Sequence, residues 1–174
     1  AVEWSAREWE QRTFGTIEVE GMPHLKDYND RNTFENDVRA WRNEQKEGLL
    51  KIRAFHEKED REHAQSNLIN TGIYFIKASL MADLASYITP IDDPNPYCDY
   101  GYHIIPSLLP NRLEEFASRK FYADMAERVR KGKYPVYAYL LPPDVYWRDV
   151  HNPRSLLDVN MDILAGRCST GIEN

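Results

Sequence analysis

Three short stretches carry side chains that could act on a phosphorylated substrate. Glu57 and Lys58 follow an apolar run and place a carboxylate beside an ammonium group. Asn70 and Gly72 stand at the entrance of a second apolar run, with a polar threonine between them. Asp149 comes later, between a Trp-Arg pair and a valine. Together these side chains suit a site that binds a phosphorylated ligand and a metal ion.

Each stretch also has an ordinary interpretation when it is taken alone. Glu57 and Lys58 could be a solvated pair at the end of a strand, Gly72 a glycine at a strand entrance, and Asp149 a turn or cap residue. The five histidines are scattered along the chain and show no spacing typical of metal ligands. The three stretches therefore indicate a site only when they are taken together.

Two strands must position the first stretch. Residues 14–20 alternate between apolar and polar side chains, which predicts a strand, and residues 49–55 predict a second strand that pairs with it. The connection between them, residues 22–48, is long for a hairpin and is interpreted as an insertion with its own helix. That helix is expected to be capped by Thr33 and to end at Gly48. Its apolar face contains Phe34, Val38 and Trp41.

The second stretch leads into residues 72–76, a short apolar run that predicts a central strand buried on both faces. Helices are predicted at residues 78–87 and 111–131, the second ended by Gly132, with another after Asp99. A strand is expected at 134–141, and a final helix opens at Asn152 or Pro153. A short helix is also expected at 3–12. Strands interleaved with helices indicate an α/β fold.

Composition limits the classes of partner. The chain has 174 residues, of which 42% are hydrophobic, enough for a core, and its net charge is −6. An acidic chain does not favour a nucleic-acid backbone or an anionic membrane as its main partner, and no apolar run is long enough to span a bilayer. Cys98 and Cys168 are too few for a disulfide framework, which favours free thiols and a cytoplasmic location.

Four groups of motifs give the chain a resemblance to a known family. They are Phe14-Gly15-Thr16-Ile17-Glu18-Val19 with Phe55-His56-Glu57-Lys58, then Asn70-Thr71-Gly72-Ile73-Tyr74-Phe75, then Asp99-Tyr100-Gly101 with Ile104-Ile105-Pro106, and finally Tyr146-Trp147-Arg148-Asp149-Val150 with Ser155 and Asn160-Met161-Asp162-Ile163-Leu164. In this order they resemble the second half of the sugar-phosphate nucleotidyltransferases, which are also called nucleoside-diphosphate-sugar pyrophosphorylases. Within the family, the glucose-1-phosphate adenylyltransferases have the motif most similar to Trp147-Arg148-Asp149-Val150.

The resemblance implies a reaction in which a sugar 1-phosphate oxygen attacks the α-phosphorus of a nucleoside triphosphate and pyrophosphate leaves. Such a transfer depends on positioning and charge neutralisation. It implies that Lys58 binds the sugar phosphate and that Glu57 accepts hydrogen bonds from sugar hydroxyls.

Further substrate contacts are implied for Asn70, Thr71, Gly72 and Trp147. Asn70 offers both a donor and an acceptor, and Gly72 lets the backbone approach a sugar ring. Asp149 is implied to be a catalytic ligand of Mg²⁺, which prefers hard oxygen donors. Lys58 is the other catalytic residue implied.

The fold implied is part of a Rossmann-like mixed sheet flanked by helices, without the N-terminal nucleotide-binding half. The family's glycine-rich nucleotide loop and second metal carboxylate have no counterpart before Phe14. We therefore expect residues 1–165 to be the C-terminal, sugar-phosphate-binding half of the domain, with a helical insertion at 22–48 and a tail at 166–174. A complementary N-terminal half or second chain, and an oligomer, are expected partners.

Two departures leave other interpretations open. Glu59 stands where the family has proline, and His151-Asn152 stand where it has Gly-Thr. These changes favour a second hypothesis, a catalytically silent regulatory or structural subunit. A third hypothesis is an unrelated α/β interaction domain with chance motifs.

Overall fold

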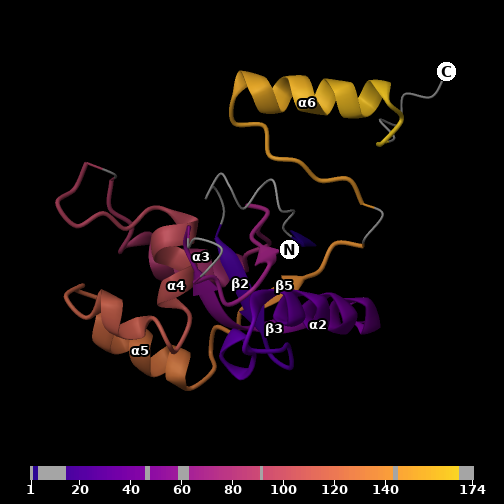
Figure 1. Cartoon of the computed structure of the whole chain (residues 1–174). Helices are drawn as coiled ribbons and strands as arrows, with labels where there is room; N and C mark the ends of the chain where they lie inside the picture. Colours follow the sequence, from indigo (N-terminus) through magenta and orange to yellow (C-terminus); the bar gives the residue numbers. More distant parts are fainter. Residues whose placement is uncertain are drawn as a thin grey trace.

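One curled sheet organises the chain (Figure 1). A computed structural model describes residues 2–3, 15–45, 48–58, 63–90, 92–142 and 145–168. Its strands are β1 (Val2–Glu3), β2 (Thr16–Val19), β3 (Leu49–His56), β4 (Leu68–Ile69) and β5 (Tyr137–Tyr139). They lie in the order β1-β4-β2-β3-β5, and all the pairs described are antiparallel. Strands combined with packed helices confirm the α/β class.

The predicted pairing of the first two long strands is confirmed. Thr16 lies opposite His56 and Ile17 lies opposite Phe55, so the register places Gly15 level with the residues that follow β3. The strand predicted after Gly132 is also confirmed, although β5 is shorter, and it pairs with the start of β3. The expected helix at 3–12 is wrong at Glu3, which lies in β1, and residues 4–12 lie outside the described part.

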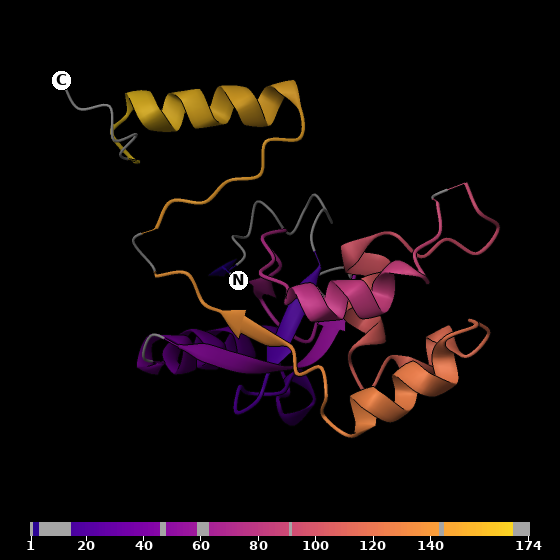
Figure 2. The ribbon, with the colours of Figure 1, turned by 180° about the vertical axis from the view of Figure 1, so that it is seen from behind.

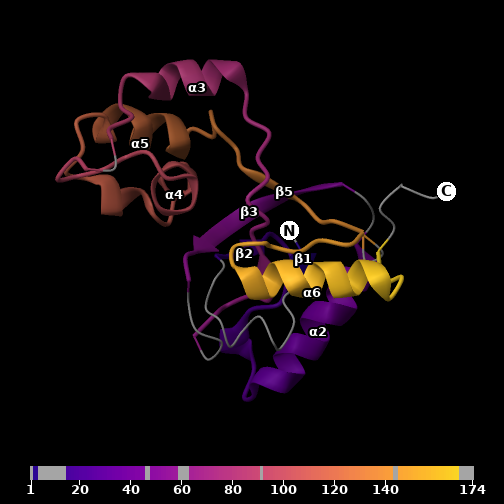
Figure 3. The same cartoon turned by 90° about the horizontal axis from the view of Figure 1, so that it is seen from above.

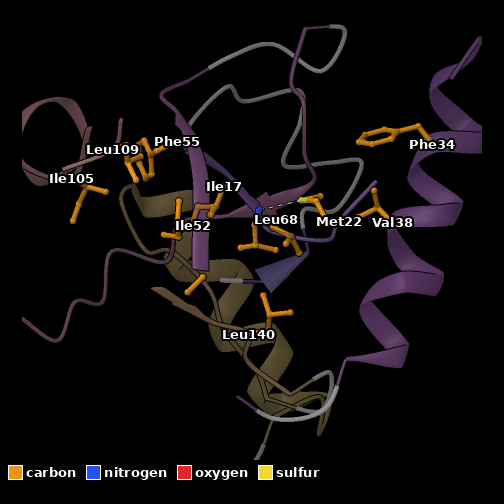
Figure 4. Packing of buried hydrophobic residues seen from close by; sticks show 12 residues of the cluster. Ile17, Met22, Phe34, Val38, Ile52, Phe55, Leu68, Ile105, Leu109 and Leu140 are labelled. Atoms are coloured by element: carbon orange, nitrogen blue, oxygen red, sulfur yellow. Dashed lines mark hydrogen bonds between the residues drawn. The ribbon is translucent and has the colours of Figure 1, made fainter. Parts of the chain in front are cut away.

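Helix α2 (Arg31–Glu44) covers one side of the sheet. Phe34 and Val38 are buried and face the core near Met22, as the apolar spacing predicts (Figure 4). The expected cap, Thr33, is wrong. Asp30 caps the helix instead, because its carboxylate accepts the Thr33 backbone N–H at 2.9 Å from an extended backbone that leads into the first turn.

The end of α2 also differs from the prediction. The helix ends with Gln45 as its C-terminal cap, before Gly48 is reached. The loop that precedes α2 contains a 3₁₀ turn, η1 (Leu25–Asp27).

A second core lies to one side of the sheet, among short helices (Figure 3). These are α3 (Ala78–Ala85), the π-helical turn η2 (Tyr100–Ile104), α4 (Ile105–Ser107), η3 (Leu113–Phe116) and α5 (Tyr122–Arg130). The single helix expected at 111–131 is divided into η3 and α5. Turning at 117–121 lets Phe116 and Phe121 both reach Tyr97, with ring centroids 6.2 and 4.8 Å away. The stop at Gly132, with φ +71°, is as predicted.

The strand expected at 72–76 is wrong. Its residues form no strand, and Phe75 is 100% exposed while Ile73 is 61% exposed. The nearest strand, β4, ends at Ile69, and Gly72 follows with φ +75°. The Asn70 side chain accepts the Gly72 backbone N–H at 3.1 Å, which makes a local turn that competes with strand pairing.

Residues 145–164, within the last described segment, are here named the C-terminal arm. It contains an irregular stretch followed by α6 (Pro153–Leu164), which lies apart from the sheet at the end of a long connection (Figures 1 and 2). Asn152 opens α6 through a capping box with Ser155, as predicted. No residue of α6 is buried. Among the described residues, no helix is long and apolar enough to cross a membrane.

Candidate functional site

Glu57 lies just past the end of β3, in a narrow space between two glycines. Its side chain is 14% exposed. A Cβ atom placed on Gly15 would lie 2.7 Å from the Glu57 Oε2, and one placed on Gly101 would lie 3.0 Å from the same oxygen. The Glu57 carboxylate therefore lies where side chains on these two residues would need space, and at Gly15 a side chain would also collide with the ring of Phe55.

The turn η2 brings the second glycine to this place. The Asp99 carboxylate caps the turn, as predicted, by accepting the Tyr102 backbone N–H at 2.8 Å. The Asp99 carbonyl accepts the Ile104 N–H at 3.0 Å, which gives the turn its π-helical width. Such turns recur at functional sites. The sequence motif flagged Asp99 and Gly101 as neighbours in a helix, but it gave no signal that they meet Glu57.

Lys58 holds its ammonium group over an aromatic ring. The Nζ atom lies 5.1 Å from the centroid of Tyr102 and 4.0 Å from Glu57 Oε1. Its backbone has φ +53°, in the left-handed region that costs free energy for any residue other than glycine. A strained residue with a half-exposed cation beside a carboxylate is a pattern found at binding sites. The contact with Tyr102 was not predicted from the sequence.

The pKa values of Glu57 and Lys58 are both raised, but by different causes. Burial raises the pKa of Glu57 above its ordinary value of 4.5, although the positive charges of Lys58 and Arg112 oppose the shift. The Asp99 carboxylate adds to the rise. The pKa of Lys58 is raised by its hydrogen bond to Tyr102, and the negative charges of Glu57 and Asp99 add to that shift. The ammonium group therefore keeps its charge at neutral pH and can meet a phosphate.

Asn70 lies beside Glu57 because its backbone is hydrogen-bonded to Gly15. Its backbone N–H donates to the Gly15 carbonyl at 2.9 Å, while its side-chain amide donates to the Tyr74 hydroxyl at 2.5 Å. The ring of Tyr74 stacks on Tyr100 of η2 at 5.2 Å. Half-buried Thr71 connects Asn70 to Gly72. The structure therefore brings two of the three predicted stretches together around Gly15.

The third stretch stays in the C-terminal arm. The Asp149 Oδ2 lies 2.9 Å from the Nδ1 of His151, and both side chains are 39% exposed. Within the described residues no hydrogen bond or ion pair joins Asp149 to Glu57, Lys58 or Asn70. Half-buried Trp147 lies in the same irregular stretch.

A metal centre was predicted at Asp149. Among the described residues, no group of three or more His, Cys, Asp or Glu side chains is arranged to hold a metal ion. A magnesium ion that keeps most of its water needs only one or two carboxylates, so the half-buried Asp149 carboxylate is chemically compatible with such a ligand. Glu59, the other departure noted in the motifs, lies outside the described residues.

Comparison with known proteins decides the family. Residues 10–166 match the nucleotidyl transferase family. The chain belongs to this family. The predicted resemblance is confirmed, and the hypothesis of an unrelated domain with chance motifs is excluded.

One curated relative is similar to the chain in more detail. The glucose-1-phosphate adenylyltransferase of Bacillus subtilis (strain 168) is 30% identical over 131 residues. This match covers 72% of the chain but 27% of the relative, so the chain spans about a quarter of the relative's length. No solved structure matches the chain.

Proposed function

We propose that this chain is the sugar-phosphate-binding part of a nucleotidyltransferase that makes a nucleoside-diphosphate sugar and pyrophosphate. The sugar substrate proposed is glucose 1-phosphate, because the similar relative is named for that substrate. The observation that carries the proposal is the meeting of Glu57, Lys58 and Asn70 around Gly15.

The chemistry of these groups suits a sugar phosphate. The Lys58 ammonium would attract the phosphate dianion, and the Glu57 carboxylate, 4.0 Å from it, would accept hydrogen bonds from ring hydroxyls. The stacked rings of Tyr74 and Tyr100 provide an apolar wall of the kind on which a sugar face packs.

The other groups that the reaction needs are proposed to come from the C-terminal arm and from a complementary part outside this chain. Asp149 would provide one oxygen ligand to Mg²⁺, which when bound neutralises charge on the phosphates of the triphosphate. A second carboxylate and the nucleotide-binding loop would come from a complementary N-terminal half or second chain. We propose that the active form is an assembly of such parts and is an oligomer.

Calorimetry of the chain with glucose 1-phosphate tests the central proposal. Lys58→Gln is expected to lower the affinity by about tenfold or more, because a charge-assisted hydrogen bond is lost. Lys51→Gln is a matched control, since Lys51 is an exposed lysine of β3 that pairs with Glu20 at 2.7 Å. Equal affinity of both variants and the unchanged chain would contradict the role of Lys58.

A second candidate function is a catalytically silent subunit that acts through protein contacts. Two observations favour it: the Asp149 carboxylate is paired with His151, and Phe75 is fully exposed. The complete assembly separates the two functions, because a silent subunit would not bind glucose 1-phosphate even with triphosphate and Mg²⁺ present. Synthesis that is lost in an Asp149→Ala assembly would support the catalytic function.

A further inference from the structure

A second polar cluster lies on β2 and β3, one step from the candidate site. Its centre is Glu18, whose side chain is 7% exposed within the sheet. The Glu18 Oε1 lies 2.7 Å from the Nε2 of His56, and the Oε2 forms an ion pair with Arg53. The Nδ1 of His24 lies 3.7 Å from the same Oε2. Nothing in the proposed chemistry uses these groups.

A β-bulge explains how the guanidinium reaches the carboxylate. Glu18 pairs with Ala54, whereas the next residue, Val19, pairs with Ile52. Arg53 is therefore the extra residue on β3, and an extra residue re-aims its side chain. The sheet is built with an irregularity at the point where Arg53 and Glu18 meet.

The cluster binds the carboxylate strongly enough to overcome its burial. Burial alone raises the pKa of Glu18, but hydrogen bonds from His56 and Arg53, together with their charges, bring the pKa below its ordinary value of 4.5. A carboxylate that remains charged inside a sheet holds its partners firmly, because removing one partner leaves an uncompensated buried charge.

The position of these partners connects the cluster to the site. His56 is the last residue of β3 and directly precedes Glu57. It lies opposite Thr16, and a Cβ atom placed on the neighbouring Gly15 would lie 2.7 Å from the Glu57 carboxylate. Any shift of the β3 end along β2 would move Glu57 relative to Gly15, and the Glu57 carboxylate lies in the space that a side chain on Gly15 would need.

We propose that Glu18 is a positioning residue for the sugar-phosphate site. Through Arg53 and His56 it fixes the end of β3, so that Glu57 and Lys58 are held between Gly15 and the turn η2. This inference rests on the proposed function of Glu57 and Lys58 as substrate contacts, but the positioning itself can be measured separately.

The test compares Glu18→Gln with Glu20→Gln in the full chain. Both variants remove the charge of a carboxylate that pairs with a side chain of β3. Glu20, which follows β2, pairs with Lys51 at the exposed surface, and the two side chains are 58% and 52% exposed. Backbone amide NMR signals of Glu57, Lys58 and Gly101 report the geometry. We expect these signals to move or broaden in Glu18→Gln and to stay in place in Glu20→Gln.

Affinity for glucose 1-phosphate is measured in the same samples. Glu18→Gln is expected to weaken it by about tenfold, comparable to the loss of a charged hydrogen bond at the site. Glu20→Gln is expected to leave it unchanged. A lowered melting temperature in Glu18→Gln with unmoved amide signals and unchanged affinity would overturn the proposal, because the role would then be structural only.

Two further results keep the outcomes separate. If Glu18→Gln does not fold, the variant His56→Gln tests the proposal instead. It removes the imidazole that bonds to Glu18, and the His56 side chain is 21% exposed. Unmoved Glu57 and Lys58 signals in His56→Gln would overturn the proposal. If the unchanged chain does not bind glucose 1-phosphate but the amide signals move in Glu18→Gln, the positioning stands and the proposed function fails.

Discussion

The sheet end around Glu57 and the C-terminal arm around Asp149 are held by different kinds of interaction. Glu57 lies between Gly15, which precedes β2, and Gly101 of η2, and its side chain is 14% exposed. Asp149 is 39% exposed, and its ion pair is to a residue two positions away. The first group is placed by tertiary packing and the second by local bonding. Within the described residues, the Glu57 side chain is enclosed by packed residues, whereas the Asp149 side chain is more open to solvent.

The side chains of α6 show the same contrast. Leu157, Met161 and Leu164 are spaced to share one side of the helix and are 51% exposed or more. Asp162 is less exposed, because it accepts the Tyr146 hydroxyl at 2.8 Å and pairs with an arginine. The apolar side of the helix therefore faces solvent while its polar side faces the chain. This arrangement supports the proposal that the active form contains a complementary part that covers the arm.

The largest expected effect compares the core of the sheet with the C-terminal arm. Phe34→Ala removes a fully buried ring from α2 and is expected to lower the free energy of unfolding by about 3–5 kcal/mol. Leu157→Ala in the arm is expected to change it by less than about 0.5 kcal/mol, because the side chain is 53% exposed. Urea denaturation followed by circular dichroism measures both. A loss in Leu157→Ala similar to that in Phe34→Ala would show that the arm packs onto the sheet.

The same contrast explains which predictions from the sequence succeed. The pairing of β2 with β3 follows from strand patterns, and the caps at Asp99 and Asn152 follow from local chemistry. These features depend on interactions between near neighbours or on one strand pair. The position of Glu57 beside Gly101 depends on a π-helical turn that no pattern in the sequence signals.

Residues 72–76 are a case in which the local sequence predicts a strand that the structure does not contain. An apolar run predicts burial, yet burial needs a surface to pack against, and the sequence of the run does not contain that surface. The local turn between Asn70 and Gly72 also competes with strand formation. Phe75 is consequently exposed, although its residue type favours a strand interior.

A smaller effect tests the enclosure of Glu57. Gly15→Ala would place a Cβ atom 2.7 Å from the Glu57 Oε2 and 2.8 Å from the ring of Phe55. Because the ring is buried, the variant is expected to lose roughly 1–3 kcal/mol of unfolding free energy and to weaken glucose 1-phosphate binding. Gly48→Ala is the matched control, since a Cβ atom there meets nothing within 4 Å. Equal stability of the two variants would contradict the close packing around Glu57.

The arm has a corresponding local test. Asn152→Ala removes the side chain that accepts the Ser155 N–H at 2.8 Å and is expected to cost about 1 kcal/mol of helix stability. The loss should appear as reduced helical content and faster amide exchange in α6, with the exchange of β2 and β3 unchanged. Slower folding of the whole chain, or altered exchange in the sheet, would show that the arm and the sheet are one cooperative unit.

The smallest expected effect is the pH dependence that Glu57 gives to stability. Because its folded-state pKa is raised, mainly by burial, the native state holds a proton that the unfolded state has already lost in the range just above pH 4.5. The contribution of Glu57 to stability is therefore complete below pH 4.5 and is lost as the pH rises through the folded-state pKa. Glu57→Gln removes this dependence, so the variant should gain stability relative to the unchanged chain as the pH rises across that range. Parallel urea curves at several pH values measure the difference. A constant difference would mean that Glu57 is as well solvated as an exposed carboxylate, and the contrast with the arm would then disappear.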